Sequence, residues 1–261
     1  MCGITGITNY EIKDRKISVK KMTDAIRHRG PDDDGYLVDE YVAFGMRRLS
    51  IIDLAHGRQP ITTNDGRFSI FFNGEIYNYK EIKAELTDYQ FKTDSDTEVI
   101  LAGFAKWGEQ VLPRLRGMFA FAIYDTLEKK VILARDFFGI KPLYYFKNGD
   151  KVVAFSSEIK SFLTLRDFKP EVNDAAVFNY LSFQYNPLEE TFFKDVFKLP
   201  PAHFMTIDLK TGQSKQEKYW QFDFKPQKSD AGRVMQKIIS FLDGEIRKDP
   251  CIWSLFVKGH H

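Results

Sequence analysis

Residues 118–124 read Met118-Phe-Ala-Phe-Ala-Ile-Tyr124, and a second apolar run, Val131-Ile-Leu-Ala134, follows after a short polar segment. The same arrangement recurs at 143–146 and 152–155, where the intervening Asn148-Gly149 is a strong hairpin signal. Connections this short join antiparallel strands, because a parallel crossover needs a dozen or more residues. This part of the chain therefore predicts antiparallel β-meanders.

Further strands and several helices flank these meanders. The other β-rich runs lie at 3–8, 36–38, 67–72 and 203–207. Helical patterns lie at 19–26, 77–86, 97–107, 157–165 and 174–182, with Ser18, Asp96, Ser156 and Asn173 as the expected cap residues. Many strands flanked by amphipathic helices predict a layered α+β domain, in which two sheets pack together and helices cover the outer faces.

Composition narrows the class of protein. The chain has 261 residues, of which 43% are hydrophobic, so it is long and apolar enough to bury a core. With 38 Lys+Arg against 36 Asp+Glu it lacks the basic excess of a nucleic-acid binder. Only two cysteines are present, and neither an export signal nor a run of ~20 apolar residues is found. We expect a cytoplasmic protein without nucleic-acid or membrane partners.

Cys2 is the sharpest chemical feature of the sequence. Removal of Met1 would leave a thiol and a free α-amine on one residue, and cysteine is small enough for that removal. The α-amine has a pKa of about 7.7–8.0 and the thiol about 8.5, so the amine can accept the thiol proton near neutral pH. Taken alone, however, a cysteine at this position is better explained as a small buried residue in an N-terminal strand.

Two other polar segments are candidates for a site. A strand of bulky residues is expected to end at Asn73-Gly74, where an amide and a backbone N–H would make a two-donor oxyanion hole. The alternative is an ordinary hairpin or strand-to-helix turn. The segment 94–98 is by itself a helix N-cap cluster. His28 has no second His or Cys at ligand spacing, so no metal site is predicted.

Nine strings in order resemble the glutaminase half of glutamine-hydrolysing asparagine synthetases, over roughly residues 1–225. They are Met1-Cys-Gly-Ile4, Arg27-His-Arg-Gly-Pro-Asp32, Arg48-Leu-Ser-Ile-Ile-Asp53, Asn73-Gly-Glu-Ile-Tyr-Asn78, Ser95-Asp-Thr-Glu-Val99, Gly117-Met-Phe-Ala-Phe-Ala-Ile-Tyr-Asp125, Ala134-Arg-Asp136, Gly139-Ile-Lys-Pro-Leu-Tyr-Tyr145 and Phe155-Ser-Ser-Glu-Ile-Lys160.

The resemblance implies an N-terminal-nucleophile hydrolase fold, a four-layer αββα sandwich of two antiparallel sheets between helices. It also implies that Cys2 attacks the glutamine side-chain amide to give a thioester, with Asn73 and Gly74 stabilising the oxyanion. The implied substrate-binding residues are Arg48 for the α-carboxylate, Asp96 and Glu75 for the α-ammonium, and backbone groups of Leu49, Ile51 and Ile52. Glutamate and ammonia are the implied products.

The end of the sequence departs from that family. We expect a glutaminase domain at 1–225, then a linker and the truncated start of a synthetase domain at 226–261, with a helix at 234–246 that has one apolar face. The family's Ser-Gly-Gly-x-Asp-Ser loop for ATP does not occur. We therefore expect no cofactor in this chain, since ATP and magnesium would belong to the synthetase domain. The apolar residues at 250–261 make a truncated or frameshifted reading frame the simplest hypothesis.

Three functional hypotheses follow. The first is a class II glutamine amidotransferase domain that hydrolyses L-glutamine but cannot make asparagine alone. The second is a glutamine-binding or interaction module, pairing through the 234–246 face with a synthetase subunit or with a second copy. The third is the glutaminase domain of a related amidotransferase, such as amidophosphoribosyltransferase or glucosamine-phosphate synthase. The strings at 48–53 and 73–78 fit asparagine synthetase better.

Overall fold

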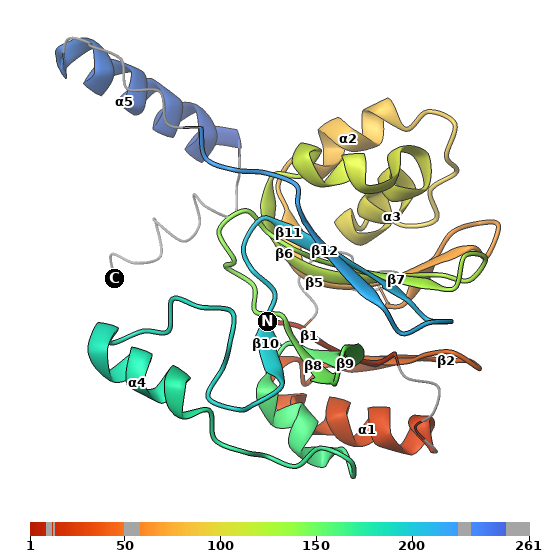
Figure 1. The fold of residues 1–261 in the computed structure, drawn as a ribbon. Helices are drawn as coiled ribbons and strands as arrows, with labels where there is room; N and C mark the ends of the chain where they lie inside the picture. The colour runs from red at the N-terminus through yellow and green to blue at the C-terminus, as the bar shows by residue number, and fades with distance from the viewer. Residues whose placement is uncertain (9–11, 13, 50–57, 224–230, 249–261) are drawn as a thin grey trace. The chain divides into compact units, whose positions relative to one another are not determined.

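The fold was analysed in a computed structural model, which describes residues 1–8, 12, 14–49, 58–223 and 231–248. The chain divides into two compact units, Met1–Gln221 and Phe222–His261. The first contains two six-stranded sheets in which every strand pairing is antiparallel (Figure 1).

The first sheet is built around the N-terminal strand. Its β1 pairs with β9 on one side and with β3 on the other. In spatial order the strands are β10 (Val196–Lys198), β8 (Tyr144–Asn148), β9 (Lys151–Ser156), β1 (Gly3–Ile7), β3 (Ala43–Arg48) and β2 (Asp33–Val38).

The second sheet contains the longest strands, and its centre is formed by β5, β6 and β7. In spatial order the strands are β12 (Ser214–Lys218), β11 (His203–Asp208), β7 (Lys130–Arg135), β6 (Gly117–Asp125), β5 (Phe68–Ile76) and β4 (Ile61–Thr62). Because β4 pairs with β5 only near its start, the end of β5 is an open edge.

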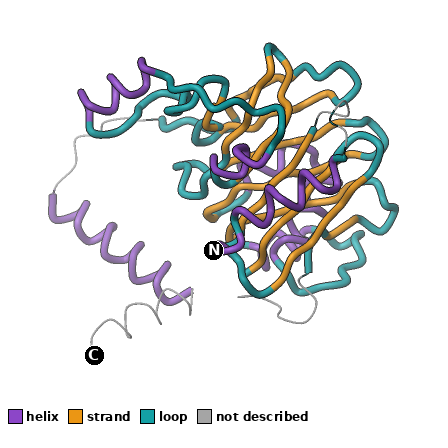
Figure 2. Tube along the Cα trace, turned by 90° about the horizontal axis from the view of Figure 1, so that it is seen from below, coloured by secondary structure: helices purple, strands orange, loops and turns teal. Residues whose placement is uncertain are grey.

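Helices cover both outer faces, as Figure 1 shows, and Figure 2 shows them in purple against the orange strands. The first sheet is covered by α1 (Arg15–Ala25) with the 3₁₀ helix η3 (Ile159–Thr164), and the second by α2 (Tyr79–Glu85) and α3 (Asp96–Trp107). The other helices are η1 (Arg27–Arg29), η2 (Gly108–Arg114), α4 (Asp174–Phe183) and α5 (Ala231–Lys248). The structure has the predicted αββα layers.

Side-chain alternation along each strand builds separate cores. In β3, Phe44 and Met46 face the space between the sheets, whereas Ala43 packs with the α1 and η3 side chains. In β5, Phe71 faces the other sheet, and Ile70 and Phe72 face the helices. The layer between the sheets is aromatic, with Phe44 in edge-to-face contact with Phe71, Tyr124 and Phe155.

Several local predictions need correction. The strand at 67–72 does not end at Asn73-Gly74; β5 continues to Ile76 because both residues pair with β6. The helix predicted at 157–165 is the 3₁₀ helix η3. Ser18 lies inside α1, which begins at Arg15. The α3 N-cap is Ser95, whose hydroxyl accepts from the Thr97 N–H, so Asp96 is the first helical residue.

Other predictions are confirmed, and some fall outside the described residues. Asn173 caps α4, and the predicted 234–246 helix lies within α5. Four strands were not predicted, because they are short or carry polar residues: β3, β4, β10 and β12. Most of the predicted linker (224–230) and the apolar tail at 250–261 lie outside the described residues.

Candidate active site

Two strands, and the residue that precedes a third, direct candidate site side chains into the space between the sheets. Strand alternation places Arg48 on the same face of β3 as Phe44 and Met46. The same rule places Asn73 and Glu75 on the face of β5 that carries Phe71. Cys2, immediately before β1, packs against this inter-sheet core. Strand register therefore brings the predicted nucleophile Cys2, the predicted substrate-binding cation Arg48 and the amide donor Asn73 into one layer.

The Cys2 thiol is held by the chain that follows β3. The Leu49 N–H donates to Cys2 Sγ at 3.4 Å, and the thiol donates back to the Leu49 carbonyl at 3.6 Å. Behind it, Arg29 Nε donates to the Cys2 carbonyl at 2.9 Å and is anchored by Glu158 at 3.0 Å. Both the backbone and the side chain of Cys2 are thus fixed, while the residue stays partly exposed to the pocket.

Asn73 presents a buried donor without an acceptor. The residue is 1% exposed, and its Nδ2 has no hydrogen-bond partner among the described residues. An orphaned amide in a protein interior is costly and calls for an explanation. A ligand oxygen entering the pocket lined by Asn73 and Cys2 would supply the missing acceptor.

The Gly74 N–H lies on the open edge of β5, between two bonded neighbours. The Phe72 N–H donates to Gln59 Oε1 at 2.7 Å, and the Ile76 N–H donates to Asp96 Oδ2 at 3.0 Å. Because N–H directions alternate along a strand, Gly74 directs its N–H to this same edge. A Cβ on Gly74 would lie 2.2 Å from the Met118 carbonyl oxygen, so only glycine fits.

Asp96 forms the acidic wall of the pocket. It is 4% exposed, and burial raises the pKa of its carboxyl to about 6, with the nearby charge of Glu75 acting in the same direction. The Ile76 and Thr97 N–H groups, and the Ser95 hydroxyl, oppose that rise because they stabilise the carboxylate. Arg48, 5% exposed, lines the same pocket, so the pocket wall contains charged side chains of both signs.

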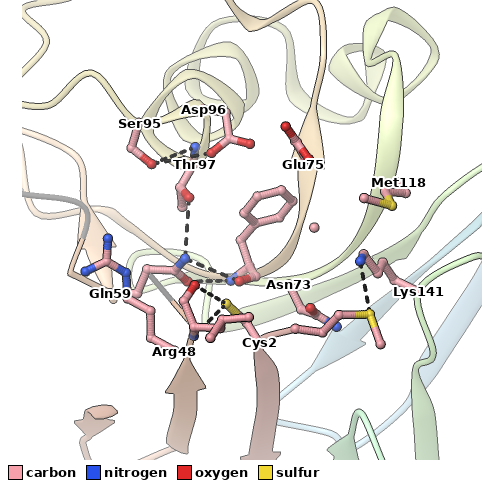
Figure 3. A pocket seen from close by; sticks show the side chains of 14 residues that line it. Cys2, Arg48, Gln59, Asn73, Glu75, Ser95, Asp96, Thr97, Met118 and Lys141 are labelled. Atoms are coloured by element: carbon pink, nitrogen blue, oxygen red, sulfur yellow. Dashed lines mark hydrogen bonds between the residues drawn. The ribbon is translucent and has the colours of Figure 1, made fainter. Parts of the chain in front are cut away.

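These residues share one cavity of about 150 Å³, shown in Figure 3. It brings together every predicted site residue that the structure describes: Cys2, Arg48, Leu49, Asn73, Gly74, Glu75 and Asp96. Ile51 and Ile52, also predicted, lie outside the described residues. The remaining lining residues, not singled out from the sequence, are Met1, Gln59, Phe72, Ser95, Thr97, Met118 and Lys141.

Neither Gln59 nor Lys141 gave a usable signal in the sequence. Gln59 completes the edge of β5, because its amide also donates to the Phe72 carbonyl at 3.2 Å. It sits alone in a polar stretch without periodicity. Lys141 belonged to one of the strings that carried the family resemblance, but a lysine in a loop is ordinarily a solvated side chain.

No group of three or more His, Cys, Asp or Glu side chains suited to a metal is present in the part of the chain that the structure describes. Within those same ranges, no helix combines the length and hydropathy needed to cross a bilayer.

The two antiparallel sheets between helices, with a cysteine nucleophile candidate entering β1, define an N-terminal-nucleophile hydrolase fold. Residues 1–220 match the glutamine amidotransferase domain family, and the chain belongs to that family.

Curated relatives resemble the chain over most of its length. Asparagine synthetase [glutamine-hydrolyzing] 1 of Bacillus subtilis (strain 168) is 41% identical over 244 residues, or 91% of this chain and 38% of the relative. Asparagine synthetase [glutamine-hydrolyzing] 2 of the same organism is 41% identical over 84% of this chain and 30% of its own length. The chain is homologous to the glutaminase part of these asparagine synthetases and spans about a third of their length.

Among solved structures, glutamine phosphoribosylpyrophosphate amidotransferase from B. subtilis, complexed with ADP and GMP, matches with a TM-score of 0.63. It is 19% identical and covers 85% of this chain and 50% of its own. Similarity at that level shows the shared fold alone, whereas the 41% identity relates the sequence to asparagine synthetases.

Proposed function

We propose that this chain hydrolyses L-glutamine to glutamate and ammonia through a thioester on Cys2, after removal of Met1. The observation that carries the proposal is the unpartnered Asn73 amide, buried in the same pocket as the Cys2 thiol. A pocket that only binds the amino-acid portion of glutamine has no need of an orphaned donor beside a thiol.

In the proposed mechanism the Cys2 α-amine accepts the thiol proton, and sulfur attacks the side-chain carbonyl carbon of glutamine. The carbonyl oxygen becomes an oxyanion, which accepts hydrogen bonds from Asn73 Nδ2 and the Gly74 N–H. Collapse of this intermediate expels ammonia, which takes the proton from the α-ammonium. Water then attacks the thioester with the amine again as base, and glutamate is released.

Substrate orientation follows from the two charged walls. The Arg48 guanidinium offers a planar pair of donors for the α-carboxylate, which a lysine cannot provide. We propose that Asp96 and Glu75 receive the α-ammonium, and that Leu49 contributes backbone contacts beside the thiol. The bonds between Leu49 and Cys2 Sγ support this, because substrate held at Leu49 lies beside the nucleophile.

We further propose that the ammonia serves a synthetase domain or subunit that makes asparagine from aspartate and ATP; the names of the relatives, asparagine synthetase [glutamine-hydrolyzing], support an asparagine product. ATP and magnesium would be bound there. Pairing of two copies is the alternative assembly. A cytoplasmic location fits the low cysteine content, because a disulfide framework is absent from the sequence.

The test compares the purified chain with its Cys2→Ala variant, using intact mass and glutamate release from L-glutamine. We expect a mass lacking Met1 and glutamate formation only when Cys2 is intact. Trapping with hydroxylamine should yield γ-glutamyl hydroxamate from the thioester. Glutamine binding with equal affinity by both proteins, without glutamate release from either, would instead support a binding module.

A further inference from the structure

Gln59 lines the active-site pocket, and its side-chain amide bonds both backbone groups of one residue in β5. The Phe72 N–H donates to Gln59 Oε1 at 2.7 Å, and Gln59 Nε2 donates to the Phe72 carbonyl at 3.2 Å. A peptide group of a neighbouring antiparallel strand would make the same pair of bonds. The Gln59 amide therefore replaces a strand at the edge of β5 that β4 leaves open.

The same amide also bonds α3. Gln59 Nε2 donates to Thr97 Oγ1 at 3.4 Å, the bond drawn between these two residues in Figure 3. Thr97 directly follows Asp96, whose carboxylate accepts from the Ile76 N–H at 3.0 Å. The strand β5 is thus joined to the start of α3 both before and after Gly74, once through Gln59 and once through Asp96.

The backbone of Gln59 is fixed against β2 of the first sheet. A Cβ added to Gly35 in β2 would lie 1.8 Å from the Gln59 carbonyl oxygen, so the two backbones are in close contact. The preceding residue, Arg58, donates to the Asp33 carboxylate at 2.8 and 2.9 Å, although an ion pair this exposed adds little stability. Gln59 is 9% exposed, so its buried amide has a fixed backbone on one sheet and its bonds on the other.

The two proposed oxyanion donors lie immediately after Phe72. Asn73 Nδ2 has no hydrogen-bond partner among the described residues, so no such bond of its own holds it in place. The Gly74 N–H points to the same edge of β5 as the Phe72 N–H, because these directions alternate along a strand. The direction of both donors therefore depends on the backbone of β5 at Phe72, the point that Gln59 holds.

Pairing with β6 keeps β5 in the sheet whether or not Gln59 is bonded. Every residue of β5 has a partner in β6, so loss of the Gln59 amide does not release the strand. It leaves the N–H and the carbonyl of Phe72 without partners in a buried position, and rotation of these peptide groups toward water is the expected response. Such a rotation changes the direction of the Asn73 side chain and of the Gly74 N–H.

A small displacement of these donors affects the transition state more than the bound substrate. Removal of one oxyanion donor typically lowers kcat by about 10²–10³, and a misplacement of about 1 Å can cost about 10². The oxyanion exists only after sulfur has attacked, so donors directed at it lower the barrier without tightening the binding of glutamine. The effect of Gln59 therefore belongs in kcat and not in KM.

We infer that Gln59 is a positioning residue for the oxyanion hole, whose amide holds Asn73 and Gly74 in the orientation that receives the oxyanion. The inference rests on the proposed function, because an oxyanion forms only if Cys2 attacks glutamine. Gln59 does not itself donate to the oxyanion, since Nε2 already donates to the Phe72 carbonyl and to Thr97.

Two variants of Gln59 and one control test this role. Gln59→Met keeps the length of the side chain but removes the amide, and Gln59→Glu keeps an acceptor for the Phe72 N–H. Gln216→Met is the matched control, because Gln216 is a partly buried glutamine on β12 that donates to Glu189 at 3.3 Å and lies outside this pocket. The measurements are kcat and KM for glutamine, the melting temperature, and hydrogen–deuterium exchange in the peptide that contains β5.

For Gln59→Met we expect kcat to fall by roughly 10–100-fold, with KM within about twofold of the wild type and with faster exchange in β5. Gln59→Glu should have a higher kcat than Gln59→Met, and Gln216→Met should match the wild type. An unchanged kcat in Gln59→Met, or a loss that lies mainly in KM, would overturn the inference. If Gln59→Met does not fold, Gln59→Asn, which is one methylene too short to reach Phe72, gives the same comparison.

A second comparison tests whether Gln59 acts through the two donors. In Asn73→Ala one donor is already absent, so adding Gln59→Met should lower kcat by a smaller factor than it does in the wild type. A general loss of packing would instead lower kcat by the same factor in both backgrounds. Equal factors would therefore contradict a positioning role and leave a merely structural one.

Hydrogen exchange separates this inference from the proposed function. If the wild type releases no glutamate but Gln59→Met still exchanges faster in β5, the proposed hydrolysis fails and the control of the β5 edge by Gln59 holds. If the wild type is active and Gln59→Met changes neither kcat nor exchange, the hydrolysis holds and the role of Gln59 fails.

Discussion

At the scale of single residues, Asn73 and Asn78 form a natural pair for comparison. Asn73 has an unpartnered amide in the pocket, whereas Asn78 donates to the Arg114 carbonyl at 2.9 Å and accepts from the Arg116 N–H at 2.8 Å. The two asparagines lie in the same sequence string, at its first and last positions. We propose that Asn73 binds the ligand, whereas Asn78 closes the connection to α2.

We predict that Asn73→Ala lowers kcat for glutamine by about 10²–10³ while leaving the melting temperature close to that of the wild type. Asn78→Ala should do the reverse, costing roughly 1–3 kcal/mol of unfolding free energy because two backbone groups lose their partners. Glutaminase kinetics and thermal melts on both variants check this. Equal loss of activity in two equally stable variants would contradict the oxyanion assignment.

The carboxyl of Asp96 should make substrate binding pH-dependent. Its pKa is raised to about 6 by burial, so it becomes protonated as the pH falls through that value and no longer attracts an ammonium. We predict that KM for glutamine rises below about pH 6, while Asp96→Asn has a high KM throughout. A KM that is flat from pH 8 to 5, in a protein that stays folded, would argue against Asp96 as the ammonium site.

The raised pKa of Asp96 also predicts in which direction the stability of the protein changes with pH. A carboxyl whose folded pKa lies above its unfolded value of 3.8 stabilises the protonated folded state, so its contribution is lost as pH rises from about 4 to about 6. Relative to wild type, Asp96→Asn should therefore gain stability over that window and keep the gain at higher pH. Urea melts at pH 4 and pH 8 measure the difference.

At the scale of elements, the open edge of β5 is the part of the fold that makes the site. Pairing with β6 satisfies one edge of the strand over its full length, and β4 covers the other edge only at its beginning. Beyond β4, Gln59 and Asp96 replace the missing strand by bonding the N–H groups on either side of Gly74. A complete neighbouring strand would have bonded the Gly74 N–H, so the shortness of β4 leaves this donor for the proposed oxyanion.

At the scale of the whole molecule, the first unit carries an apolar surface along α4 and the segment after it. Its large side chains are between 45% and 74% exposed, which is unfavourable in water unless another surface covers them. They are Phe178, Tyr180, Leu181, Phe183, Tyr185 and Leu188. Since the chain spans only 30–38% of two of its relatives, we propose that the synthetase part of such a protein is the occupant.

We predict that α4 is protected from hydrogen–deuterium exchange when the synthetase part of a relative is joined to this chain. The comparison uses this chain alone and a chimera in which the C-terminal part of B. subtilis asparagine synthetase 1 follows residue 220. Exchange in α4 should slow in the chimera, while α1, which covers the first sheet, serves as the unchanged internal control. Equal exchange in both proteins would rule out α4 as the covered surface.

The sequence by itself determined the layers and much of the site. Continuous apolar runs such as 118–124, bounded by turn residues, predicted buried strands, and the short polar connections required antiparallel pairing. The sequence also singled out Asn73, Gly74, Glu75 and Asp96 as candidate site residues, although it did not predict that one strand carries the first three. The thiol and the α-amine of Cys2 belong to one residue, so their pairing could be predicted from the sequence without knowing the fold.

Only the tertiary structure decided which distant residues meet. Cys2 and Leu49 are separated by 47 positions, and their contact depends on β1 pairing with β3. Asn73-Gly74 was expected at a strand end, because an Asn-Gly pair is locally a turn signal, yet pairing with β6 extends β5 through it. Lys141 lies in one of the quoted strings, but nothing in that string predicts its burial, which arises from a loop held by Arg135 and Asp136 against the rest of the fold.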